Sequence, residues 1–145
     1  MSKFEALALA VDEPARMTIV HPGTGASLCI QGDEKSVAYI DVYSADSDIA
    51  KTHHRRYGQK RLDALQRKRK LNTKVEEYEE ADIELLVALT SGWRLIGLDG
   101  APLDVEFSAD NARELYSTQA FAWLRDQVNE FAADRGNFSK ASSKS

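Results

Sequence analysis

Three histidines and one cysteine are the side chains of this chain best suited to metal binding or nucleophilic chemistry. His53 and His54 are adjacent, so on a helix they point about 100° apart and cannot grip one metal ion as an i, i+4 pair can. His21 is remote from both and precedes a proline. Solvated or hydrogen-bonded histidines are therefore a better interpretation than a metal site.

The single cysteine, Cys29, excludes a disulfide within the chain and a multi-cysteine zinc site. It lies in the apolar-rich stretch 27–30 without basic neighbours, so we expect a packed side chain rather than a reactive thiol. No Ser/His/Asp or Cys/His constellation stands out, and neither GxxxxGK[ST] nor GxGxxG is present. The sequence therefore predicts a protein that is not an enzyme and needs no cofactor.

Charge is strongly segregated along the chain. Residues 51–70 contain nine Lys or Arg and one carboxylate, Asp63, and an acidic cluster follows over 76–84. Three interpretations remain open: two helices whose opposite charges face each other, a basic surface for an acidic protein partner, or a nucleic-acid-binding surface. The acidic neighbours and the lack of stacking aromatics other than Tyr57 make nucleic acid the least favoured partner.

Length and composition indicate one domain of an ordinary globular kind. The chain has 145 residues, 43% hydrophobic and 29% charged, with a formal net charge of −4. The N-terminal apolar run, 6–11, is too short for a signal core, and the run over 85–89 is far too short to cross a bilayer. We therefore expect a soluble protein in a reducing cytoplasm, with no membrane partner.

The first third of the chain has the sequence pattern of β-strands. Runs at 17–20, 28–31 and 37–43 are rich in β-branched and aromatic residues and are separated by Gly-containing turns. The last run alternates apolar and polar positions, which is typical of a half-buried strand. Together they predict a small antiparallel β-meander that needs helices to cover one face.

Helical patterns fill the remainder. We expect a helix over about 46–70 capped by Ser44 or Ser47, a second over about 74–90 ended near Gly92, and a packed loop over 93–100. We expect Ser108 to be the N-cap of a third helix. A stripe of apolar residues indicates the fourth, which ends at Gly136. The stripe consists of Phe121, Leu124, Val128 and Phe131.

The predicted fold class is thus α+β, with a β-meander of about three strands followed by about four α-helices. The expected organisation is an N-terminal arm over 1–15, a single domain over 16–136 and a flexible tail over 137–145. Within the domain, 16–43 form the meander and 44–136 the helical part.

Several blocks of the sequence resemble the tail assembly chaperones of long-tailed bacteriophages. They begin with 17–25 (MTIVHPGTG) and 42–47 (VYSADS), and continue with 89–93 (LTSGW) and 107–116 (FSADNARELY). They close with 124–128 (LRDQV) and 131–138 (FAADRGNF). No single block is diagnostic, because each also reads as a cap, a turn or a core stripe. The resemblance lies in their joint order, which covers 17–138.

The resemblance implies a role in assembly. Such proteins coat the tape measure protein before the tail tube forms, and a longer frameshifted form of many of them engages the tube protein. It also implies action in the host cytoplasm, absence from the finished virion, and self-association as a further option. The alternatives are a structural tail or head–tail joining component of the virion, and a small nucleic-acid-binding regulator.

Candidate partner contacts are basic or apolar residues that lack an obvious partner within the chain. Trp123 also fits this description because it lies one residue off the apolar stripe of the last helix. The candidates are Arg55, Arg56, Tyr57, Arg61, Leu62, Leu65, Trp123 and Phe138.

Overall fold

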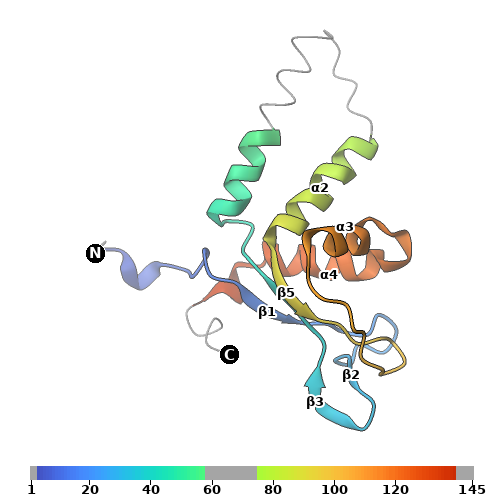
Figure 1. Ribbon diagram of the computed structural model, residues 1–145. Helices are drawn as coiled ribbons and strands as arrows, with labels where there is room; N and C mark the ends of the chain where they lie inside the picture. Colours follow the sequence, from blue (N-terminus) through green and yellow to red (C-terminus); the bar gives the residue numbers. More distant parts are fainter. Residues whose placement is uncertain (1–2, 58–74, 140–145) are drawn as a thin grey trace.

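The computed structural model describes residues 3–57 and 75–139 (Figure 1). It has an α+β architecture, which confirms the predicted fold class. The strands are β1 (Ala15–Thr18), β2 (Cys29–Ile30), β3 (Asp33–Val37), β4 (Tyr39–Val42) and β5 (Thr90–Arg94). The α-helices are one over 48–57, α2 (Val75–Leu89), α3 (Ala109–Ser117) and α4 (Ala122–Ala133). Short 3₁₀ turns are η1 (Glu5–Leu7), η2 (Gln119–Phe121) and η3 (Arg135–Phe138).

The main sheet is antiparallel and has the strand order β1-β4-β5. Its central strand places Ile40 between Met17 of β1 and Trp93 of β5. In β1, Met17 is buried whereas its neighbours Arg16 and Thr18 are exposed. This alternation gives the sheet one face toward the core and one toward solvent.

The predicted antiparallel sheet of three strands is confirmed, but one of its strands is not the one that the sequence predicted. Residues 28–31 contribute to a separate two-stranded hairpin, β2-β3, and the third strand of the main sheet is β5. Strand β1 pairs directly with β4, and the ladder continues past β1, where the Ile19 N–H donates to the Ala38 carbonyl at 3.0 Å. Two alternating strands thus pair with each other, and the short run between them forms the hairpin.

Strand β5 corrects two further expectations about 90–100. The second helix ends at Leu89, and Thr90–Arg94 form a strand instead of a helix end and a packed loop. Gly92 lies opposite Asp41 in the ladder. A glycine after a helical run resembles a helix end locally, and the strand that pairs with it lies far earlier in the chain.

The helices α2, α3 and α4 pack together and cover the buried face of the sheet (Figure 1). The core joins Met17, Ile40 and Val42 of the sheet to Tyr116 of α3 and Val128 of α4. Ser108 caps α3 as predicted, because its Oγ accepts a hydrogen bond from the Asn111 N–H at 3.0 Å. In the described part of the chain, no helix is both long and apolar enough to cross a membrane.

Both ends of the predicted domain extend further than expected. Ala15 is buried in β1, so the fold begins within the predicted arm. At the other end, Phe138 lies in η3 with 0% exposure, and its carbonyl accepts the Ala10 N–H at 2.7 Å. The chain therefore remains part of the core at least to Phe138.

Candidate partner-binding surface

The helix over 48–57 is fixed to the body at its N-terminal end. Ser47, fully buried, accepts a hydrogen bond from the Ala50 N–H at 3.3 Å and so acts as the predicted cap. Just before it, Asp46 accepts a hydrogen bond from Arg135 of η3 at 2.8 Å, and this bond lowers the pKa of Asp46. The N-terminal end of the helix over 48–57, called the basic helix below, is thus fixed to the C-terminal turn η3.

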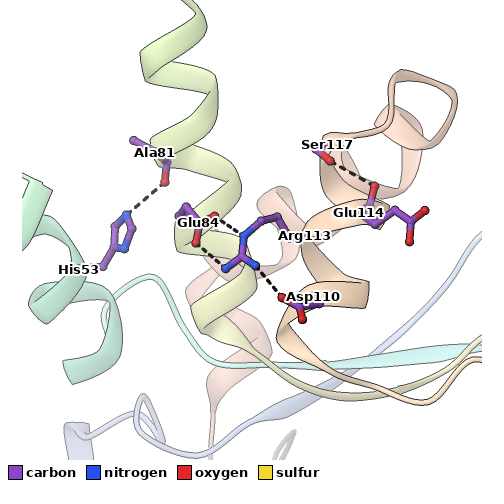
Figure 2. A network of polar contacts seen from close by, with 7 residues as sticks. All are labelled: His53, Ala81, Glu84, Asp110, Arg113, Glu114 and Ser117. Carbon is purple, nitrogen blue, oxygen red and sulfur yellow. Dashed lines mark hydrogen bonds and ion pairs between the residues drawn. The ribbon is translucent and has the colours of Figure 1, made fainter.

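The inner side of this helix faces α2. Ala50 is fully buried, and His53, one turn later, is half-buried. His53 Nε2 lies 3.1 Å from the Ala81 carbonyl oxygen, and this bond requires the proton on Nε2 (Figure 2). Tyr57 is half-buried at the next turn, and its hydroxyl has no hydrogen-bond partner among the described residues.

The outer side of the same helix is basic and open. Arg55 and Arg56 are exposed, and neither forms an ion pair with any residue in the described ranges. Of the predicted contact residues, the structure thus places Arg55 and Arg56 on this exposed side, whereas Tyr57 is half-buried on the inner side of the same helix. Three further candidates, Arg61, Leu62 and Leu65, lie outside the described residues.

The acidic helix α2 has a cationic partner on its other side. Arg113 of α3 makes a two-pronged ion pair with Glu84 and reaches Asp110 at 3.1 Å (Figure 2). Hydrogen bonding to Glu84, and the charge of that carboxylate, raise the pKa of Arg113. Part of the acidic charge is therefore matched by α3.

A cavity of about 170 Å³ lies between α2 and α4. It is lined by Asp82, Leu86, Arg125, Asp126 and Asn129. Arg125 is oriented by a hydrogen bond from Nη1 to a backbone carbonyl of α3 at 3.2 Å. The lining offers opposite charges without a thiol, hydroxyl or imidazole, so it is suited to binding polar groups.

The histidines and the cysteine form no common cluster, although the rings of the adjacent His53 and His54 are in edge contact. His21 Nδ1 accepts hydrogen bonds from the Gly23 and Thr24 N–H groups, which stabilises a turn. Cys29 is half-buried in β2, opposite Val37. Over the described residues, no group of three or more His, Cys, Asp or Glu side chains could hold a metal ion.

The two remaining candidates are part of the packed interior. Trp123 is half-buried and packs against the core. Phe138 is fully buried, with its ring centroid 5.7 Å from that of Phe131 in an edge-to-face contact. The prediction of Phe138 as a partner contact is therefore wrong, because the core already covers its ring.

Sequence reasoning missed the exposed apolar side chains of two other segments. One is the N-terminal segment around η1, where Leu7 is 79% exposed. The other joins β5 to α3 and exposes Leu98, Leu103 and Val105. Neither segment has the helical or alternating periodicity from which buried and exposed faces are predicted in a sequence.

Comparisons with models of protein families, with curated protein sequences and with solved structures gave no match for this chain.

Proposed function

We propose that this protein is a tail assembly chaperone of a long-tailed bacteriophage, which binds and coats the tape measure protein and assists tube assembly. The proposal rests first on the sequence resemblance, whose blocks follow in order from 17 to 138. The structural observation that carries it is the exposed pair Arg55 and Arg56, without an ion pair among the described residues. Such guanidinium groups are available to carboxylates of another protein.

The physical requirement of this role is a surface that covers a long helical partner. Tape measure proteins are long and rich in helix, and uncovered apolar stripes on such a chain would aggregate. A small protein shields them when its surface offers apolar and charged side chains, and the helix over 48–57 carries the half-buried Tyr57 as well as the exposed Arg55 and Arg56. In this proposal the protein acts in the host cytoplasm, leaves before the virion is complete, and engages the tube protein through a longer frameshifted form.

A nucleic-acid-binding regulator is the second candidate, favoured by the same two arginines. Two exposed carboxylates on the adjoining helix α2, Glu80 and Asp82, argue against nucleic-acid binding because they repel phosphates. Binding to DNA that falls steeply with rising salt would support this candidate, and no binding at low salt would remove it.

Reversal of the basic side tests the chaperone proposal. We expect Arg55→Glu, Arg56→Glu and Arg61→Glu together to weaken capture of the co-expressed tape measure protein at least tenfold and to leave more of it insoluble. The control is Lys3→Glu with Lys35→Glu, two exposed residues away from this helix, which should capture it normally. Unchanged capture by the triple variant would eliminate the basic side as the binding surface.

A further inference from the structure

The segment that joins β5 to α3 folds back on itself, so that its residues 101–103 run antiparallel to 95–97. The Gly97 N–H donates to the Ala101 carbonyl at 2.8 Å, and the Leu103 N–H donates to the Leu95 carbonyl at 3.0 Å. Two residues further, the Trp93 indole N–H donates to the Val105 carbonyl at 2.8 Å. These contacts recur at every second residue, as they do along an extended edge of a sheet.

The tip of this segment is fixed against the β2-β3 hairpin. The Gln31 N–H donates to the Gly100 carbonyl at 3.0 Å. Gly100 has φ +83°, and a Cβ added there would lie 2.9 Å from the Gln31 side chain, so only glycine fits. The loop is therefore ordered before any partner arrives, which lowers the entropic cost of binding.

The outer edge of the segment is open at Asp104. Ala101, Leu103 and Val105 direct backbone groups toward 95–97 and the Trp93 indole, so the groups of the residues between them point to the opposite, outer side. Pro102 has no N–H to offer, but Asp104 has both an N–H and a carbonyl, and neither has a partner among the described residues. An unpaired edge of this kind is a template for another strand.

The side chains along this edge combine apolar and acidic groups. Leu98, Leu103 and Val105 are 53%, 51% and 42% exposed. Asp104 and Glu106 are exposed carboxylates and form no ion pair within the described ranges. An apolar surface bordered by unmatched negative charge is complementary to a partner that carries apolar and cationic side chains.

We propose that the edge over 102–106 binds an extended peptide segment of another protein, in which apolar residues alternate with Lys or Arg. Strand addition satisfies the Asp104 main-chain groups, which a docked helix would leave unpaired. Alternation places the apolar residues of the peptide against Leu103 and Val105 and leaves its cations near Asp104 and Glu106. This surface is separate from the helix over 48–57, so the peptide-binding proposal can be tested independently of tape measure binding.

The test is an NMR titration of the ¹⁵N-labelled full chain with three synthetic peptides: alternating Val/Lys, alternating Ser/Lys and alternating Val/Glu. We expect saturable shifts at the amides of 103–106 with the Val/Lys peptide alone. Equal binding of the Ser/Lys peptide would show that charge alone causes the binding. Shifts confined to residues outside 102–106 would place the binding site elsewhere. Either result would overturn the proposal.

Two variants sharpen the result. Asp104→Lys with Glu106→Lys should weaken the Val/Lys peptide at least tenfold and create binding of the Val/Glu peptide. Leu103→Ser with Val105→Ser should also weaken the Val/Lys peptide, whereas Leu7→Ser, at another exposed apolar residue, should not. All positions are exposed, and an unchanged amide spectrum elsewhere verifies that each variant is folded. Retained Val/Lys binding by both double variants would contradict the proposal.

Discussion

At the scale of single residues, one buried polar contact joins three elements of the core. Tyr116 is fully buried, and its hydroxyl lies 2.7 Å from Thr90 Oγ1. Thr90 Oγ1 in turn donates to the Leu86 carbonyl at 2.7 Å. This chain of hydrogen bonds joins α3, β5 and α2, and each member satisfies a buried group that would otherwise be costly.

The buried phenol predicts a loss of stability in alkaline solution. Burial raises the pKa of Tyr116 from 10.0 to about 12, so folding favours the protonated form. This contribution is complete below pH 10 and is lost as the pH rises from 10 towards 12. In urea unfolding, the stability difference between wild type and Tyr116→Phe should fall by about 1.4 kcal/mol between pH 9 and pH 11. A difference that stays constant over this range would contradict the assigned environment.

Single residues also show where sequence reasoning fails. Ser47 and Ser108 were predictable caps, because capping depends on neighbours three residues away. Phe138 was misassigned, since its burial depends on Phe131 and on the distant backbone of Ala10. No local pattern reveals such a contact.

At the scale of elements, α4 closes one edge of the sheet through a single side chain. The amide of Gln127 accepts the Val20 N–H at 3.0 Å and donates to the Val20 carbonyl at 2.7 Å. It thus substitutes for a neighbouring strand just beyond β1. Edges covered in this way do not pair with other chains.

Replacement of Gln127 should therefore destabilise the fold more than replacement of an exposed residue on the same helix. We expect Gln127→Ala to lower the free energy of unfolding by about 1–3 kcal/mol, because it leaves two half-buried backbone groups unpaired. Asn129→Ala, on the same helix but exposed, should change it by less than about 0.5 kcal/mol. Chemical denaturation of both variants measures the contrast, and equal effects would refute the role of Gln127.

Some helices and strands could be predicted from the sequence and others could not. The helix α3 was predictable from its cap, and α4 from an apolar stripe, because both signals are local. The bounds of α4 were not, since it ends at Ala133 before Gly136 and Phe121 of the stripe is exposed. Strand β5 was not, since Thr90–Arg94 follow a helix directly and pair only with the much earlier β4. Of the binding surface, the charge of Arg55 and Arg56 was visible in the sequence, but their lack of described ion-pair partners was not.

At the scale of the whole molecule, the two proposed binding surfaces differ in charge and in position. The basic helix stands on the same side as α2, whereas the 102–106 edge lies by the β2-β3 hairpin (Figure 1). One suits an acidic helical partner and the other a cationic extended one. A protein with two unlike surfaces can hold two different partners together, which is what recruitment of tube subunits to a tape measure protein requires.

The central claim is that the protein serves assembly and then departs. The direct measurement is quantitative mass spectrometry of this protein in infected-cell lysates and in purified virions of the same phage. We expect the protein to co-purify with the tape measure protein from the lysate and to be undetectable in virions. Its presence in virions at a fixed ratio to the tail proteins would contradict the account and identify a structural component.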